Sequence, residues 1–280
     1  MKKRFIDYNR IEKFKAFLIN EERSEATVEK YLRDIIRFYN FSGGGEIDKT
    51  KVMAYKSELG RNFAVASANS MIAAINAFFR FCEWYELCVK QFRIQHDAYC
   101  SEEKELTKAE YIRLINTSKK RKKERLNLII QTICGTGIRV SELQYITVES
   151  LDKGEALVNC KGKKRRIFIV PELRKKLLSY IKAHKIRSGT VFVTRSGRPV
   201  SRNNVWKEMK SLCEEAQVAE SKVFPHNLRH LFARTFYGIE KDIAKLADIL
   251  GHASVNTTRI YIVTTGVEHR RKMENMHLIV

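Results

Sequence analysis

The segment PHNLRHLFARTFYGIEKDIAKLADILGHASVNTTRIY, residues 225–261, combines helix-boundary residues with polar side chains suited to an anion. Pro225 suits the first position of a helix, and His226 and Arg229 follow three residues apart, on one face of its first turns. Unpaired backbone N–H groups and the helix dipole favour negative charge at that end. The pattern predicts a phosphate-binding site.

The second half of the same segment adds further polar side chains. An apolar-periodic helix over residues 243–250 is expected to stop at Gly251, a natural C-terminal cap, with His252 directly after it. A Ser/Thr/Asn-rich segment then leads to Tyr261, and residues 256–258 in it are interpreted as helix-start residues without a further role. Each of these histidines and the tyrosine, taken alone, more often caps or packs than reacts. Together with the arginine, they can converge on one phosphodiester.

Composition predicts a globular protein that folds without disulfide bonds or a structural metal ion. It has 280 residues, 44% of them hydrophobic, and three prolines, which is enough for a sizeable core. The six cysteines form no C-x-x-C pair, so neither a zinc site nor a disulfide framework is expected. We expect them to be reduced thiols in a cytoplasmic protein. No stretch has transmembrane length, and Asp7, Arg10 and Glu12 interrupt the basic N-terminus before a signal-peptide core can form.

Net charge gives the strongest global signal. The chain carries 53 Lys+Arg against 32 Asp+Glu, a formal charge of +21. Residues 1–100 hold 17 basic and 13 acidic residues, so +17 of the +21 falls on residues 101–280. Such a surface favours a polyanion, and location beside the nucleoid follows if that polyanion is DNA. Charge alone argues for nucleic acid and not for catalysis.

Hydrophobic periodicity predicts a mainly α-helical chain with a small β-hairpin, in two domains. Residues 1–95 are expected to form a helical bundle, residues 96–104 a linker and residues 105–280 an α+β domain. The helices predicted for the bundle cover about residues 11–18, 27–41 and 67–87, with a third helix through Leu59 that either Asp48 or Thr50 caps. In the second domain, Thr107 and Glu110 have the spacing of a capping box.

The middle of the second domain contains two motifs with open interpretations. A buried helix over 126–134 is followed by a predicted turn at 135–137 and a new helix from Ile138, in which Arg139 and Glu142 lie on one side. Alone, these two favour a surface ion pair over a site. A hairpin is predicted with strands 155–160 and 165–170 around the turn KGKK, 161–164. Its basic tip suits a DNA groove, but a basic turn is equally expected at any solvent-exposed position. A short strand over 191–193 and a helix over 201–216 complete the prediction.

Some reaction classes lack the residues they need. The sequence has no H-E-x-x-H, no clustered carboxylates and no G-x-x-x-x-G-K-[ST] loop, which argues against metal-assisted water attack and nucleotide hydrolysis. Two guanidiniums can instead neutralise the charge that grows on phosphate oxygens during attack. No metal ion or other cofactor is therefore expected.

These motifs, in this order, resemble the tyrosine recombinase (phage integrase) family, and the compact two-domain size is most similar to Xer-like recombinases and small mobile-element integrases. The matching residues are TGIRVSEL at 136–143, KG at 161–162, HNLRH at 226–230, LGH at 250–252 and Tyr261. Any one motif is weak, but all five in order are specific. The resemblance implies an N-terminal core-binding domain and a C-terminal catalytic domain.

By resemblance, Arg139 and Arg229 clamp the non-bridging oxygens of the scissile phosphate. Lys161 in the hairpin protonates the departing 5′ hydroxyl. Lys163 and Lys164 are the alternatives for that acid, because the hairpin lysine is the hardest position to match.

The resemblance also assigns the remaining site residues. Tyr261 is the nucleophile, His226 takes its proton or bonds the phosphate, and His252 bonds the phosphate. Glu142 and His230 support their neighbours rather than react.

The implied partner is double-stranded DNA carrying a specific recombination site, bound by four copies of the chain that are monomers in solution. Lys163, Lys164, Arg165 and Arg202 are the candidate DNA-contacting side chains. The apolar tail over 262–280 packs on a neighbouring subunit or covers its own domain. Two competing hypotheses remain: a type IB topoisomerase-like enzyme, and a basic DNA-binding protein of the same fold that does not cut.

Overall fold

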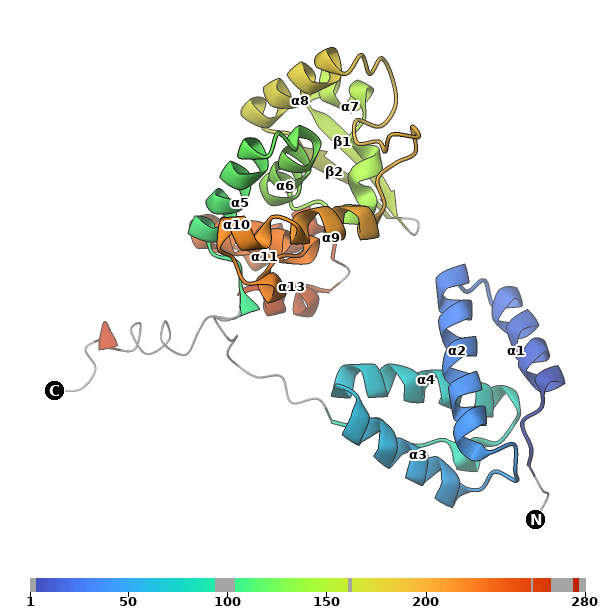
Figure 1. Cartoon of the computed structure of the whole chain (residues 1–280). Helices are drawn as coiled ribbons and strands as arrows, with labels where there is room; N and C mark the ends of the chain where they lie inside the picture. The colour runs from blue at the N-terminus through green and yellow to red at the C-terminus, as the bar shows by residue number, and fades with distance from the viewer. Residues whose placement is uncertain (1–3, 94–103, 161–162, 253, 263–273, 277–280) are drawn as a thin grey trace. The chain divides into compact units, whose positions relative to one another are not determined.

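The computed structural model describes residues 4–93, 104–160, 163–252, 254–262 and 274–276. It divides into two compact units, residues 1–96 and 97–280 (Figure 1). The linker predicted over 96–104 and the tail predicted over 262–280 fall almost entirely outside the described residues and stay predictions. Within the described ranges, no helix is long and apolar enough to cross a membrane.

The first unit is a helical bundle, as predicted. Its elements are α1 (Tyr8–Asn20), α2 (Glu25–Ser42), α3 (Lys49–Asn62), α4 (Val65–Phe81) and the 3-10 turn η1 (Tyr85–Leu87). Helix α2 packs along α4, and the fully buried rings of Phe14, Phe38 and Phe78 lie in the core between the helices. The periodic aromatic residues of this half are therefore core residues.

Helix α4 is shorter than the prediction of 67–87. It ends at Phe81, because Glu83 adopts a left-handed conformation with φ 60° and the Trp84 N–H returns to the Phe79 carbonyl at 2.8 Å. Leu87 still reaches the core, but through η1. Because apolar residues continue with helical spacing beyond Phe81, periodicity alone predicts a longer helix than the one that forms.

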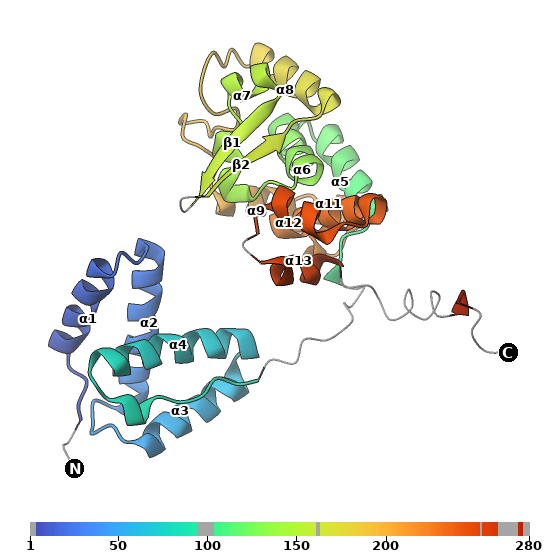
Figure 2. The same ribbon diagram turned by 180° about the vertical axis from the view of Figure 1, so that it is seen from behind.

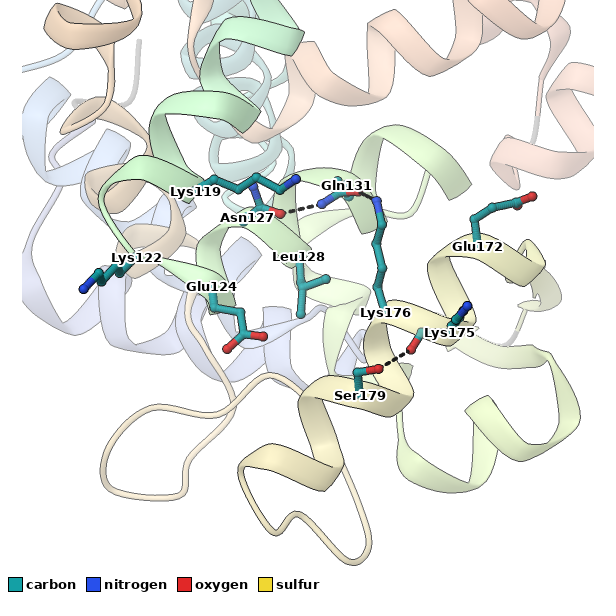
Figure 3. Close-up of a pocket in the computed structure, with 10 residues that line it drawn as sticks. All are labelled: Lys119, Lys122, Glu124, Asn127, Leu128, Gln131, Glu172, Lys175, Lys176 and Ser179. Carbon is teal, nitrogen blue, oxygen red and sulfur yellow. Dashed lines mark hydrogen bonds between the residues drawn. The ribbon is translucent and has the colours of Figure 1, made fainter.

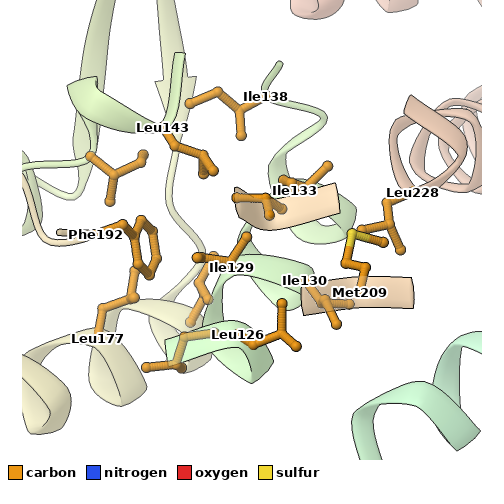
Figure 4. Packing of buried hydrophobic residues seen from close by; sticks show 14 of the residues in the cluster. Leu126, Ile129, Ile130, Ile133, Ile138, Leu143, Leu177, Phe192, Met209 and Leu228 are labelled. Carbon is orange, nitrogen blue, oxygen red and sulfur yellow. The ribbon is translucent and has the colours of Figure 1, made fainter. Parts of the chain in front are cut away.

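The second unit is built around one buried helix. Its elements are α5 (Lys108–Lys120), α6 (Glu124–Thr136), η3 (Val140–Tyr145), α7 (Val148–Lys153), β1 (Glu155–Cys160), β2 (Lys163–Phe168), α8 (Pro171–Ala183), α9 (Arg202–Lys210), α10 (Cys213–Ala216), η4 (Glu220–Lys222), α11 (Pro225–Glu240), α12 (Ile243–Leu250) and α13 (Val255–Ile262). Helix α6 packs against α5, α8, α9 and α11, and its isoleucines lie at the centre of the core (Figure 4). The capping box of Thr107 and Glu110 starts α5, as predicted.

Several predicted boundaries in this unit are wrong. Gly135 and Thr136 still belong to α6, and only Gly137 takes the left-handed cap conformation, with φ 66°. The segment after it forms the 3-10 helix η3 rather than an α-helix. The short turns of a 3-10 helix are enough to pack this segment against the buried core, so the segment does not need to form an α-helix.

The predicted hairpin is present, with a tighter turn. Strands β1 and β2 pair antiparallel from Glu155 opposite Phe168 to Cys160 opposite Lys163, which leaves two residues, not four, between the strands. In the segment 191–193, predicted as a strand, only Val193 forms an isolated bridge, with Pro199. The helix predicted over 201–216 is broken into α9 and α10. Local periodicity does not reveal where a chain bends around its own core.

The helices α11, α12 and α13 lie together at one end of the second unit (Figure 2). Helix α11 begins at Pro225 and α12 ends before the left-handed Gly251, both as predicted from the opening segment. Helix α11 also packs on α6, so the end of α6 and the start of α11 lie near each other. The predicted site residues lie on these elements.

Candidate active site

Arg229 lies at the centre of the predicted site. On the first turns of α11, it is 1% exposed, and its guanidinium donates to the carbonyls of Gly137 and, at 2.6 Å, Leu250. Burial, followed by the nearby Arg139, lowers the pKa of Arg229 to about 10, so it stays charged at neutral pH. Its Nε, also buried, has no acceptor among the described residues. This buried cation can accept an anionic partner.

The C-terminal end of α12 binds a guanidinium at each of three successive carbonyls. Ile249 accepts from Arg165 at 2.5 Å, Leu250 from Arg229 at 2.6 Å and Gly251 from Arg139 at 3.5 Å. The last carbonyls of a helix lack partners within it and carry the negative end of its dipole. One helix end therefore holds three cationic side chains close together.

Glu142 is the anion that balances two of these arginines. It is 2% exposed and accepts from the Arg139 N–H at 2.9 Å, from the Arg139 guanidinium at 3.0 Å and from Arg165. Burial acts to raise the pKa of this carboxyl, but the Arg139 N–H and the two guanidiniums outweigh it and hold the pKa below its usual range. Glu142 is therefore held between two arginines in a position that favours its ionised form, and its supporting role in the reaction stays a prediction.

Arg165 does not face outward as a DNA-contacting side chain would. Its side chain is 11% exposed and is held by Glu142 and by the end of α12. The backbone alternation along β2 turns it toward the site, because successive strand residues point to opposite faces. The sequence pattern indicated a basic tip but not which cation turns inward.

Tyr261 lies inside the site among three histidines. It is 3% exposed, and its hydroxyl lies 3.2 Å from His226 Nε2. The ring centroids of His230, His252 and His226 lie 4.3, 5.3 and 5.7 Å from that of the tyrosine. Burial, followed by Arg229, lowers the pKa of His226, so its neutral ring can accept the phenol proton.

His252 joins Arg229 to α13. Its Nε2 lies 3.0 Å from the Arg229 guanidinium and its Nδ1 2.8 Å from the Thr258 hydroxyl. Thr258 is fully buried, yet it was given no role from the sequence. Its position three residues before Tyr261 was the available signal, since residues three apart share a helix face. The prediction of helix-start residues without a further role over 256–258 does not include this contact of Thr258.

His230 contacts the ring of Tyr261 from α11. Burial, followed by His226, lowers the pKa of His230 to about 4, so it is a neutral ring at physiological pH. Its contacts with His226 and Tyr261 are between rings. That His230 supports its neighbours rather than reacts stays a prediction.

A cleft of about 590 Å³ opens beside these groups. Arg139, Arg202, Trp206, His226 and Arg229 are among its lining residues. Arg202 is exposed at the first position of α9, as predicted. The cleft offers guanidiniums and an imidazole to a bound anion, while the buried Tyr261 is not among its lining residues.

The hairpin lysines are only partly described. Lys161 lies outside the described residues, and for Lys163 only the backbone, in β2, is placed. Lys164 is exposed on β2, opposite Asn159. The choice of general acid among them stays a prediction.

A second hollow, of about 660 Å³, lies between α5, α6 and α8 (Figure 3). Four lysines contribute to its lining, and Lys176 donates to Gln131 at 2.6 Å. None of the predicted site residues lines it. Elsewhere in the described parts of the chain, no group of three or more His, Cys, Asp or Glu side chains gathers in a metal-binding arrangement.

Paired arginines, neutral histidines and a buried tyrosine define a site for phosphoryl transfer to a tyrosine hydroxyl. Comparison with known proteins points to the same class. Residues 104–266 match the phage integrase family, and residues 11–86 match its N-terminal SAM-like domain. The chain therefore belongs to the phage integrase family. Within it, the chain is a tyrosine recombinase, an enzyme of site-specific recombination.

Similar proteins cover nearly the whole chain. Tyrosine recombinase XerA of Thermococcus kodakarensis is 30% identical over 273 residues, 94% of this chain and 93% of the relative. XerC of Lactobacillus delbrueckii subsp. bulgaricus is 28% identical over 275 residues, 89% of this chain and 92% of the relative.

Solved structures share the fold at lower identity. A lambda integrase dimer bound to a COC′ core site matches with a TM-score of 0.75 at 15% identity, covering 93% of this chain and 78% of the other. XerH bound to its difH substrate matches with a TM-score of 0.70 at 19% identity, covering 95% and 84%. These matches confirm the predicted fold class.

Proposed function

We propose that this chain cleaves and rejoins strands of double-stranded DNA at a specific recombination site, through a 3′-phosphotyrosyl intermediate and without a metal ion or ATP. The observation that carries the proposal is the hydrogen-bonded pair of Tyr261 and His226, 3.2 Å apart, beside a cleft lined by Arg139 and Arg229. A nucleophile within reach of a base, next to fixed cations, is the arrangement that covalent phosphoryl transfer needs.

Arg139 and Arg229 bind the non-bridging oxygens of the scissile phosphate. Charge grows on these oxygens as the phenol attacks, and guanidiniums held in place by α12 carbonyls need no rearrangement to neutralise it. Arg229 Nε, a buried donor without an acceptor among the described residues, supports this role. Glu142 and Arg165 keep Arg139 in place from behind.

His226 takes the proton of Tyr261 as the phenol attacks. The phosphorus–oxygen bond to the tyrosine forms, and the bond to the 5′ oxygen breaks. A hairpin lysine, Lys161 or one of its alternatives Lys163 and Lys164, protonates the leaving oxygen. Because Tyr261 is buried, attack also requires the short helix α13 to bring the phenol to the cleft.

A DNA hydroxyl reverses the reaction, which conserves the energy of the phosphodiester and removes the need for ATP. Exposed Lys164 and Arg202 contact the duplex beside the cleft. Four copies act on two synapsed duplexes, and the chain works in the cytoplasm at the nucleoid. Structures of a lambda integrase tetramer on a Holliday junction support this assembly by analogy.

Covalent trapping tests the proposal. The protein and its Tyr261→Phe variant are incubated with nicked duplexes tiled across the DNA that flanks the gene, in buffer containing EDTA. We expect an SDS-resistant protein–DNA band from the wild type that the variant lacks. Tight binding without a band from either protein would favour a non-cutting DNA-binding protein, and relaxation of any supercoiled plasmid would favour a topoisomerase.

A further inference from the structure

The contacts of His252 determine which of its nitrogens carries the proton. A guanidinium only donates, so His252 Nε2, 3.0 Å from Arg229, must accept. The ring is neutral, because burial, followed by the charges of Arg229, Arg139 and Arg165, lowers its pKa to about 4. The proton therefore lies on Nδ1, which donates to Thr258 Oγ1 at 2.8 Å.

Thr258 makes this contact from the helix that carries the nucleophile. It is fully buried and lies three residues before Tyr261, on the same face of α13. Its hydroxyl, the His252 ring and the Arg229 guanidinium form one continuous chain of hydrogen bonds. The helix of the tyrosine is thereby connected to the central arginine of the clamp.

We propose that Thr258 is a positioning residue for DNA cleavage: its hydroxyl holds the His252 proton on Nδ1 and so keeps Nε2 directed at Arg229 and the scissile phosphate. This inference rests on the proposed function, in which Arg229 binds the scissile phosphate, and on the resemblance, which assigns His252 a bond to the same phosphate. Nothing in the sequence pattern had assigned the hydroxyl a role.

The same hydroxyl serves the ring in both protonation states. A bound phosphate adds negative charge beside His252 and favours its charged form, in which Nε2–H donates to the phosphate. Nδ1–H still needs its acceptor, and Thr258 Oγ1 supplies it. The groups facing the ring are Arg229 and His226 on α11, Arg139 before η3, Arg165 on β2 and Tyr261 on α13. Without the hydroxyl, a buried N–H beside these groups would have no acceptor.

Three variants of the full-length chain separate the hydroxyl from packing. Thr258→Val keeps the shape and removes the hydroxyl, Thr258→Ser keeps the hydroxyl, and Thr257→Val makes the same change at an exposed neighbour. The rate of covalent adduct formation on the nicked duplexes is measured between pH 5.5 and 9. Imidazole ¹⁵N NMR of the DNA-free proteins reports the His252 tautomer independently of any reaction.

We expect Thr258→Val to react about 10-fold more slowly at neutral pH, the effect of losing one buried hydrogen bond, with the alkaline limb of its pH profile moved to lower pH. Thr258→Ser and Thr257→Val should stay within about 2-fold of the wild type, whose NMR spectrum should show His252 protonated on Nδ1. A uniform rate loss across pH, a Ser variant as slow as Val, or a proton on Nε2 in the wild type would overturn the inference. If the wild type forms no adduct, the proposed function fails, whereas the NMR result still decides the tautomer.

Discussion

At the scale of single residues, the site depends on balancing buried cations. Arg139, Arg165 and Arg229 lie around the end of α12, and Glu142 is the carboxylate that contacts two of them. A charge at a buried position is tolerated only when it is paired and hydrogen-bonded. The positive site that can bind a phosphate therefore depends on a carboxylate that never touches it.

Replacing Glu142 by Gln tests this balance. Removing one partner of a buried ion pair costs about 3 kcal/mol or more, because the remaining charges lose their compensation. We expect the free energy of unfolding of Glu142→Gln to fall by about that amount in urea titration. The exposed pair of Lys245 and Glu240 offers a control, and Glu240→Gln should leave the free energy of unfolding close to that of the wild type. Equal effects in the two variants would contradict this account.

The histidines predict a pH dependence of stability. The pKa values of His230 and His252 are lowered from 6.5 to about 4, and that of His226 is also lowered. The unfolded chain takes up these protons near pH 6.5 while the folded chain does not, so stability is complete above pH 6.5 and falls as pH drops toward 4. Thermal unfolding of the DNA-free protein between pH 7.5 and 5 should show a falling Tm.

His230→Phe is the control for that series, because it removes one of the titrating rings and keeps an aromatic ring against Tyr261. Its Tm should fall less steeply with decreasing pH than that of the wild type. Identical slopes would mean that other groups cause the acid sensitivity.

Sequence reasoning at this scale succeeded where spacing carries the information. Arg139, His226, Arg229, His252 and Tyr261 occur in recognisable motifs, and the structure brings them together. The inward turn of Arg165 and the contact of Thr258 depend on tertiary packing between β2, α12 and α13. The three-residue spacing places Thr258 on the same helix face as Tyr261, but it does not show that the hydroxyl contacts His252.

At the scale of elements, helix ends build the site. Gly137 ends α6 in a left-handed conformation, its carbonyl accepts from Arg229, and a side chain there would collide with Phe232. Gly251 ends α12 in the same way, where a side chain would collide with Arg165. Sequence pattern located both caps near the correct positions, but placed the end of α6 at Gly135, since two glycines lie within three residues.

Gly137→Ala tests the element-scale account. The left-handed conformation costs a residue with a Cβ about 1–2 kcal/mol, and overpacking against Phe232 adds about 1–3 kcal/mol. Gly154→Ala is a matched control, because Gly154 has φ 72° and open space around it. We expect the free energy of unfolding of Gly154→Ala, measured in urea, to fall only by the cost of the left-handed conformation. Its adduct formation should match that of the wild type. A Gly137→Ala protein as stable and active as Gly154→Ala would argue against this role of the α6 end.

At the scale of the whole molecule, charge and fold favour a polyanion. The net charge is +21, most of it on residues 101–280, where the cleft lies. The first unit is helical and the second contains the hairpin, which agrees with the predicted fold class. Hydrophobic periodicity is sufficient to predict the fold class, because the apolar face of a helix can be recognised without knowing which element it packs against.

Salt dependence separates the surface cations from the buried ones. If the protein makes 6–10 phosphate contacts, its affinity for duplex DNA should fall by about 10³–10⁵ between 50 and 200 mM salt. Arg202→Gln should lower the slope of log K against log salt by about one, because Arg202 is exposed beside the cleft. Arg165→Gln should leave the slope unchanged and instead lower stability. The opposite pattern, measured by fluorescence anisotropy, would restore Arg165 as a DNA contact.

Mapping the covalent adduct shows which side chain attacks the phosphodiester. The wild-type adduct, formed in EDTA on a nicked duplex, is digested with nuclease and trypsin and analysed by mass spectrometry. Tryptic peptide 260–270, IYIVTTGVEHR, contains Tyr261 and no other tyrosine. We predict that this peptide carries the mass of a residual nucleotide joined through its 3′ phosphate. Nucleotide mass on a different tyrosine peptide, or an adduct that forms only with added metal ion, would contradict the account.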